Sequence, residues 1–159
     1  MEDIEDQKKD AASWFLRHFE LSGYVDVVDG PQIDVYGSCR LRPQIQLQKI
    51  KHKFGTVTGN FCLQGSSLTN ICNIPKMVHG TAAFSWTSSL PMLCFILCPY
   101  DLLFLADNPA DNPADLRPVL AIIEKYRSKC KSGELNEKQA ILCSQKELME
   151  QKFVKNASM

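Results

Sequence analysis

Apolar residues in the middle of this chain recur at a long, nearly fixed interval. A Val-x-Gly triplet starts at Val35, Val57 and Val78, so the copies lie 22 and 21 residues apart. Further into each copy an apolar pair follows with a constant step: Leu47/Ile50, Leu68/Ile71 and Leu90/Leu93. A period near twenty residues is typical of repeat proteins, in which one short unit stacks on the next. The pattern therefore predicts a solenoid.

A shorter period indicates what each unit contains. Val25 and Val27 alternate with polar or small residues, as do Ile33 and Val35, which is the two-residue period of a strand with one buried face. We expect each Val-x-Gly triplet to form a short strand and the following apolar pair to turn inward. Because one coil cannot bury its own apolar face, we expect about three coils over residues 24–106, with a cap at each end.

Residues 1–23 are predicted to form the N-terminal cap. Ala11, Phe15 and Phe19 lie four residues apart and form one apolar stripe of a helix. Gly23 is expected to end this helix, since glycine is common just after a helix C-terminus. Trp14 lies beside the stripe and is either a cover for the first repeat or an exposed anchor for a partner. We favour the cover, because such stripes mostly bury against their own core.

The C-terminal part is predicted to be a helical hairpin that follows a linker. Residues 107–115 contain two Asp-Asn-Pro units in succession, and a residue before proline is held out of the helical region. We expect a linker there and two helices within 116–159. Gly133 is expected to end the first of these helices, and Asn136 with Gln139 predicts a capping box at the start of the second.

An almost wholly apolar run ends the third copy. We interpret Leu93, Phe95 and Leu97, and then Leu103 and Leu105, as the final buried strands of the stack. A docking surface is the alternative, because exposed apolar patches mark interaction sites.

Composition and charge narrow the class of protein. The chain is 45% hydrophobic and 23% charged, which is ordinary for a globular protein. Its 18 basic and 18 acidic residues balance, whereas a nucleic-acid binder normally carries a basic excess, so nucleic acid is not the expected partner. The charged N-terminal segment lacks the apolar core of a secretory signal, and no apolar run is long enough for a bilayer span. We expect a cytoplasmic protein without membrane contact, whose seven cysteines are reduced.

No catalytic or metal-binding pattern stands out in the sequence. Cys94 and Cys98 are the one close cysteine pair, but their spacing is not that of a zinc ribbon and no second pair follows. The chain contains no Gly-x-Ser-x-Gly elbow, phosphate loop or dinucleotide fingerprint. We expect a protein without enzymatic activity, metal or cofactor. Two alternatives stay open: a Cys–His nucleophilic pair needs no motif, and the basic stretch Lys49–Lys53 is either a solvated edge or a phosphate-binding patch.

The central repeats resemble a family of short leucine-rich-like repeats found in proteins of tailed phages and large viruses. The second copy matches at Val57, Gly59, Phe61, Cys62, Leu68, Thr69, Ile71 and Pro75. The third matches at Val78, Gly80, Leu90 and Leu93, and the first at Val35, Gly37 and Cys39. The resemblance implies a small repeat solenoid of phage or viral origin. Repeats of this kind share no catalytic residues, so the resemblance implies none here.

These observations together predict an α+β fold, a small leucine-rich-like solenoid between an N-terminal helix and a C-terminal helical hairpin. For function we expect a non-enzymatic protein–protein interaction module, namely a phage-encoded accessory protein that binds and modulates a host or phage protein in the host cytoplasm. The alternatives are a nucleic-acid- or nucleotide-directed enzyme or binder, and a minor virion component. Candidate interface residues are aromatic or arginine side chains that break the repeat pattern, because such side chains carry most of the energy at interfaces. They are Tyr36, Arg40, Arg42, Phe84, Trp86 and Tyr100.

Overall fold

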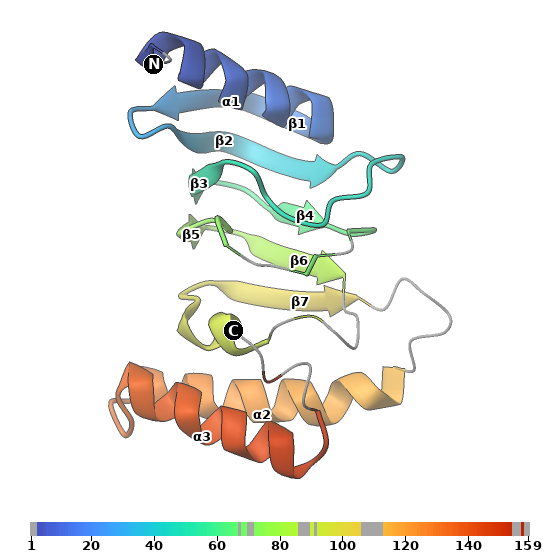
Figure 1. Cartoon of the computed structure of the whole chain (residues 1–159), viewed down its shortest axis with the longest axis vertical. Helices are drawn as coiled ribbons and strands as arrows, with labels where there is room; N and C mark the ends of the chain where they lie inside the picture. Colours follow the sequence, from blue (N-terminus) through green and yellow to red (C-terminus); the bar gives the residue numbers. More distant parts are fainter. Residues whose placement is uncertain are drawn as a thin grey trace. The chain divides into compact units, whose positions relative to one another are not determined.

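The computed structural model describes residues 3–66, 68–69, 72–85, 90, 92–105, 113–153 and 157. The chain divides into two compact units, one formed by residues 1–85 with 99–105 and the other by 86–98 with 106–159. The first unit contains a helix and all the strands, and the second contains the remaining helices (Figure 1). Trp86 and residues 107–112 of the predicted linker lie outside the described residues.

The first unit begins with helix α1, Ile4–His18, which passes directly into strand β1, Phe19–Val28. The helix therefore ends earlier than predicted, and Phe19 opens a strand. Tertiary contacts explain the difference, because the backbone N–H of Arg42 donates to the His18 carbonyl oxygen at 2.9 Å and the Arg42 guanidinium donates to the Leu16 carbonyl oxygen at 3.1 Å. These donors satisfy carbonyls that a helix end leaves without partners.

Strand β1 forms an antiparallel hairpin with β2, Gln32–Leu41, in a register that runs from Phe19 opposite Leu41 to Val28 opposite Gln32. Gly23 and Gly37 face each other in this hairpin, with φ angles of 114° and 135°. A Cβ atom on Gly23 would collide with the Tyr36 carbonyl oxygen. Gly23 is thus needed for the close approach of the β1 and β2 backbones and does not end a helix.

Parallel strands build the solenoid on this hairpin. They are β3 (Lys53–Val57), β4 (Phe61–Leu63), β5 (Met77–Val78), β6 (Thr81–Ser85) and β7 (Asp101–Leu105). The sheet order is β5-β3-β2-β4-β6-β7, with β1 attached to β2, which gives a parallel-strand solenoid of about three turns (Figure 1). Val35 pairs with Val57, and Val57 pairs with Val78. The predicted α+β solenoid and the stacking of its repeats are confirmed.

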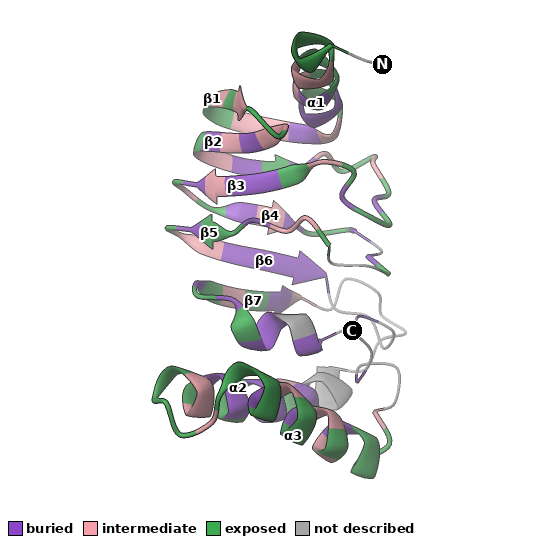
Figure 2. Ribbon diagram, turned by 60° about the vertical axis from the view of Figure 1, so that its left-hand side comes forward, coloured by how far each residue is buried: buried purple, intermediate pink, exposed green. Residues whose placement is uncertain are grey.

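The inside of the first unit is filled by the residues that the repeat pattern marks. Val35 and Val57 are fully buried and Val78 nearly so, and the paired positions Leu47/Ile50 and Leu68 are also buried, while Ile71 lies outside the described residues. Phenylalanine rings contact one another from coil to coil, from Phe61 to Phe84 at 6.2 Å and from Phe84 to Phe104 at 6.1 Å between centroids. Figure 2 shows buried positions along the strands and exposed ones on the turns between them.

Trp14 of α1 is 4% exposed and contacts the rings of Phe19 and Phe54. Its predicted role as a cover for the first repeat is confirmed.

The second unit contains the 3₁₀ helix η1 (Leu93–Leu97) and the helices α2 (Pro113–Lys131) and α3 (Glu137–Glu150). Two expectations are corrected here. Residues 93–97 form the 3₁₀ helix η1 and not a strand. The strand prediction is wrong because a continuous apolar run has no period that distinguishes a strand from a helix. Helix α2 begins inside the segment predicted as a linker, since a proline is well tolerated at a first helical position.

The capping box of α3 is confirmed. The Gln139 N–H donates to Asn136 Oδ1 at 2.8 Å, and the Asn136 N–H donates to Gln139 Oε1 at 3.0 Å. Over the described ranges, none of the helices has both the length and the apolar character needed to cross a bilayer.

Candidate protein-binding surface

The side of the β1–β2 hairpin that faces away from the core has a distinct composition. Successive side chains of a strand point to opposite sides, so one alternate set from each strand lies here. On β1 the set is Glu20, Ser22, Tyr24 and Asp26, and the register places opposite them Arg40, Ser38, Tyr36 and Asp34 of β2. We call this surface the outer hairpin face. Figure 2 shows exposed positions along β1 where this face lies.

Two tyrosine rings stack at the centre of the outer hairpin face. The ring centroids of Tyr24 and Tyr36 lie 4.8 Å apart, with an angle of 14° between the planes. Tyr24 is 63% exposed and Tyr36 is 41% exposed. Stacking restricts both rings, and the strands that carry them are paired along their whole length. The pair therefore presents a preordered aromatic surface to the solvent, of the kind that protein interfaces bury.

A charged pair and a groove lie beside the tyrosines. Arg40 Nε donates to Glu20 Oε2 at 2.6 Å, and both side chains remain partly in solvent. A groove of about 350 Å³ runs past this pair and continues to Asn60 and Cys62 on the next coil. The outer hairpin face thus combines an aromatic pair, an ion pair and an adjacent concavity, which are the components of a specific protein contact.

Burial suppresses the reactivity of Cys39 at this groove. Cys39 and Cys62 are free thiols, and Cys39 is buried. Burial, together with the nearby Cys62, raises the pKa of the Cys39 thiol to about 12. Because the thiolate is the reactive species, Cys39 is inert at neutral pH.

The structure distributes the predicted interface residues over different environments. Tyr36 and Arg40 lie together on the outer hairpin face. Arg42 holds the C-terminal end of α1 through the Leu16 carbonyl oxygen. Phe84 is fully buried in the phenylalanine column, and Tyr100 is 4% exposed and donates its O–H to the Pro75 carbonyl oxygen at 2.7 Å. Phe84 and Tyr100 are therefore core residues, which corrects their selection as interface candidates.

Sequence reasoning missed Tyr24 and Glu20, the two β1 partners of the predicted residues. A signal for them exists, because Asp29-Gly30 marks a tight turn between two alternating segments. Folding the chain back at that turn places Tyr24 near Tyr36 and Glu20 near Arg40.

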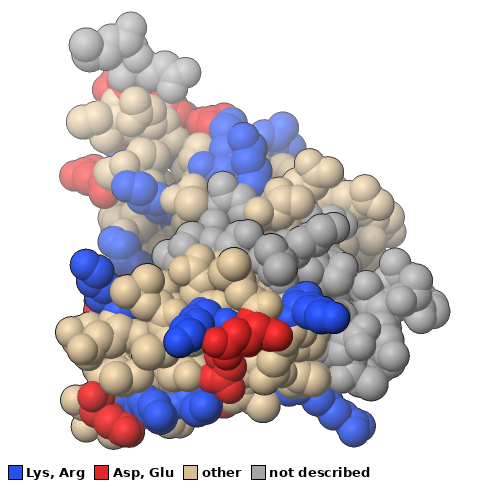
Figure 3. Space-filling model, turned by 60° about the horizontal axis from the view of Figure 1, so that its bottom comes forward, with Lys and Arg blue, Asp and Glu red and all other residues tan. Residues whose placement is uncertain are grey.

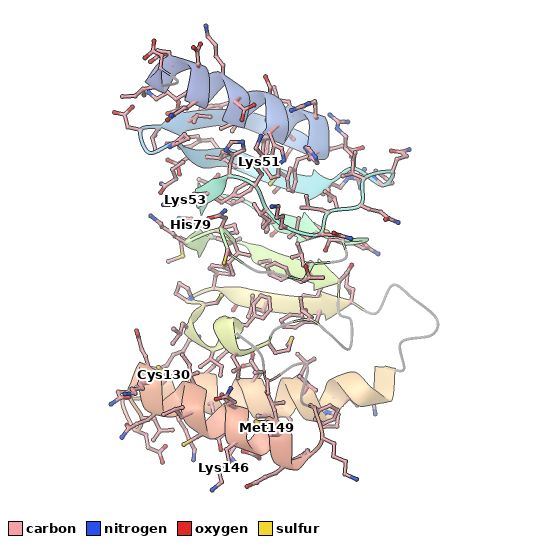
Figure 4. All side chains as sticks on the ribbon, in the orientation of Figure 1. Lys51, Lys53, His79, Cys130, Lys146 and Met149 are labelled. Atoms are coloured by element: carbon pink, nitrogen blue, oxygen red, sulfur yellow. The ribbon has the colours of Figure 1, made fainter. Side chains whose placement is uncertain are left out.

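In the basic stretch Lys49–Lys53, Lys49 and Lys51 lie next to α1, whereas Lys53 begins β3 (Figure 4). Lys51 Nζ and His52 Nε2 both lie 3.2 Å from Asp10 Oδ2. The hydrogen bond from Lys51 is the main cause of the lowered pKa of Asp10, and burial lowers the pKa of His52. A groove of about 520 Å³ next to them is lined by Trp14, His18 and Lys49, among others. Part of the positive charge of this stretch is therefore neutralised within the fold.

The second unit carries a polar cluster between α2 and α3. Tyr126 donates its O–H to Glu147 Oε2 at 2.6 Å, and Lys125 Nζ lies 3.2 Å from the same oxygen. Lys146 and Met149 lie on the same helix as Glu147 (Figure 4), and basic and acidic side chains alternate over the surface seen in Figure 3. The cluster joins the two helices.

Within the described part of the chain, no three His, Cys, Asp or Glu side chains come together as metal ligands. Comparison with known protein families, with curated proteins and with solved structures yields no match. The function is therefore argued from the geometry of the surfaces.

Proposed function

We propose that this protein is a non-enzymatic protein-binding module and that it binds its partner through the outer hairpin face. The observation that carries the proposal is the stacked pair Tyr24 and Tyr36, which is exposed although both rings are ordered on paired strands. Tyrosine is enriched among interface residues that contribute most to affinity, and burial of such an anchor contributes about 2 kcal/mol or more. The groove beside Glu20 and Arg40 adds shape to this surface.

We also propose an origin for this protein and a class of partner. The repeats resemble those of phage and large-virus proteins, which supports a phage-encoded accessory protein that binds and modulates a host or phage protein. A minor virion component is the alternative within this class. It requires that the protein be found in purified particles at a fixed copy number.

Affinity capture with three immobilised proteins tests the binding surface. They are the wild type, the double variant Tyr24→Ser/Tyr36→Ser, and the control Leu142→Ser, which removes a 54% exposed apolar side chain from α3. Proteins captured from a lysate of the natural source are identified by mass spectrometry. We expect a partner that the wild type and the control retain and the double variant loses, with little change in melting temperature. Identical capture by all three proteins contradicts the proposal.

A second candidate function is binding of a phosphate-bearing ligand at the groove next to Trp14. The lining includes Lys49 and the ring of His18. Lys49 would bind a phosphate group, and the His18 ring would stack on an aromatic base of the same ligand. It stands second because Asp10 already pairs with Lys51. Titration with ATP, followed by Trp fluorescence, tests it. Lys49→Gln should weaken binding, whereas Lys53→Gln, from the same basic stretch but outside the groove lining, should not.

A further inference from the structure

Strand β1 is an edge strand whose outer side has no strand partner among the described residues. It is ten residues long, and four of its residues are exposed: Ser22, Gly23, Tyr24 and Asp26. Helix α1 lies next to β1 (Figures 1 and 2) and Lys8 bridges to Asp29, but no described strand pairs with this edge. A strand edge of this length that is not paired offers a row of backbone donors and acceptors for another strand.

The hydrogen bonds of β2 show which residues of β1 face that edge. The N–H of Cys39 donates to the Asn60 carbonyl oxygen at 3.0 Å, and the carbonyl oxygens of Val35 and Gly37 accept from Thr58 and Gly59 at 3.0 and 2.8 Å. These three residues of β2 therefore direct their backbone toward the next coil. In an antiparallel pair, residues opposite such positions direct their own N–H and C=O away from the partner strand.

The residues of β1 opposite these positions are Leu21, Gly23 and Val25, and Val27 continues the alternation. Their N–H and C=O groups point to the open edge. The side chains between them, on the outer hairpin face, are the ones that an added strand would meet, and Tyr24 lies at their centre.

The charges next to this edge are acidic. Asp26 lies directly opposite Asp34 in the hairpin register, and like charges in that arrangement repel. Glu20 is neutralised by Arg40, and Asp29 at the end of the strand is paired with Lys8 at 2.9 Å. Asp26 makes no direct ion pair with any residue that the structure describes, although its charge contributes to the raised pKa of Lys8 on α1. A cation opposite Asp26 on an added strand would relieve the repulsion between Asp26 and Asp34.

We propose that the open edge of β1 is a strand-addition site for an extended, basic segment of a partner protein. The segment pairs its backbone with Leu21, Gly23, Val25 and Val27, places a Lys or Arg against Asp26, and lays an apolar side chain on Tyr24. Backbone pairing supplies affinity in such contacts, and the alternate side chains supply specificity. This inference rests on the proposed protein-binding function and names the chemistry of the partner.

A second copy of the chain fits this edge less well. Antiparallel self-pairing with Gly23 opposite its own copy places Glu20 opposite Asp26 twice, which adds two like-charge contacts. The charge pattern therefore favours a basic partner segment.

A labelled eight-residue threonine-rich peptide is the probe, with one Val and one Lys two residues apart so that both side chains lie on the same face of the added strand. Fluorescence anisotropy measures its binding to the full chain. The same peptide with Glu in place of Lys is the control. We expect binding of the Lys peptide only, with slowed amide hydrogen exchange at Leu21, Gly23, Val25 and Val27. Protection elsewhere in the chain, or equal binding of the two peptides, overturns the inference.

Two variants test the mechanism of binding. Val25→Pro removes an outward-facing donor without removing a bond to β2, and edge strands tolerate proline at such positions. We expect roughly tenfold weaker binding of the Lys peptide, whereas Val25→Ala, which keeps the donor, binds nearly as the wild type. Asp26→Lys reverses the charge of an exposed side chain and should reverse the preference between the two peptides. Unchanged binding by both Val25→Pro and Asp26→Lys overturns the inference, as does a concentration-dependent dimer that Val25→Pro dissociates.

The same variants distinguish this inference from the proposed function. A captured partner that is lost with Tyr24→Ser/Tyr36→Ser but retained by Val25→Pro and Asp26→Lys supports the outer hairpin face and overturns strand addition. A capture result that none of these variants changes contradicts both.

Discussion

The N–H of Gly59 donates to the carbonyl oxygen of Gly37 at 2.8 Å, and Gly80 repeats this bond to Gly59 at 3.0 Å. The last residues of the three Val-x-Gly triplets therefore form one column in which backbones of successive coils approach closely. A Cβ atom on Gly59 would lie 2.7 Å from the Gly37 carbonyl oxygen and would also collide with Ser38 Oγ. The close approach is the reason that the second and third triplets end in glycine, whereas a Cβ atom on Gly37 would collide with the Ser22 carbonyl oxygen across the hairpin.

We predict that Gly59→Ala lowers the free energy of unfolding by about 1–3 kcal/mol, because the backbone of the neighbouring coil must shift to admit the methyl group. Urea denaturation measures the change. Gly133→Asn is the control, since Gly133 has a φ of 80° that asparagine tolerates and no atom within 4 Å of an added Cβ. Equal effects of the two substitutions would show that the column does not restrict side-chain size.

Phe84→Ala should lower the free energy of unfolding by about 3–5 kcal/mol, because it opens a cavity between Phe61 and Phe104 in the phenylalanine column. Tyr24→Ala should cost only about 1 kcal/mol, since the ring is mostly exposed and loses one stacking contact. Thermal and urea unfolding compare the two variants. A larger loss for Tyr24→Ala would mean that the tyrosine pair serves stability and would count against its role as a binding surface.

The stability of the second unit should depend on pH through Glu147. The hydrogen bond from Tyr126, with the contact to Lys125, holds the pKa of Glu147 below its ordinary value of 4.5. A carboxyl group whose pKa is lower in the folded state than in the unfolded state stabilises the fold at pH values above its unfolded-state pKa. This stabilisation is lost as the pH falls through the folded-state pKa. We expect Tyr126→Phe to destabilise by about 1 kcal/mol near pH 7 and to have little effect at about pH 2.

Chemical denaturation of the wild type and Tyr126→Phe at both pH values measures this dependence. Asn136→Ala provides a comparison, because it removes a backbone cap that does not titrate and should cost about 1 kcal/mol at either pH. A Tyr126→Phe effect that is the same at both pH values contradicts the assignment to Glu147.

His52 should titrate below its ordinary value of 6.5, because burial disfavours its charged form, although Asp10 partly opposes this effect. The neutral His52 ring is therefore compatible with the fold at pH values above its ordinary pKa, and the fold loses stability as the pH falls from that value through the folded-state pKa of His52. Asp10→Asn removes the opposing carboxylate and should lower the pKa of His52 further. An NMR titration of the imidazole protons measures the pKa, with Asp26→Asn as a control that lies away from His52. A His52 pKa that rises in Asp10→Asn would contradict this account.

Local and periodic features of this fold are readable in the sequence. The spacing of Val35, Val57 and Val78 determines their stacking, because equal coils must place equal positions next to each other. The capping box of Asn136 and Gln139 depends only on residues within one helical turn. The burial of Trp14 likewise follows from its position beside the apolar stripe of α1.

The candidate site depends on contacts that are distant in sequence. Tyr24 and Tyr36 become a pair only through the hairpin register, and Phe19 leaves the helix because β1 pairs with β2 over its whole length. Phe84 and Tyr100 resemble exposed anchors when residue type alone is considered, yet Phe84 packs between Phe61 and Phe104 and Tyr100 is buried with its O–H on the Pro75 carbonyl oxygen. The chain by itself therefore determined the repeat, its stacked core and the helix cap, since each follows from residue spacing. Tertiary structure decided which side of the hairpin is exposed and which edge stays open, because both depend on where distant segments pair.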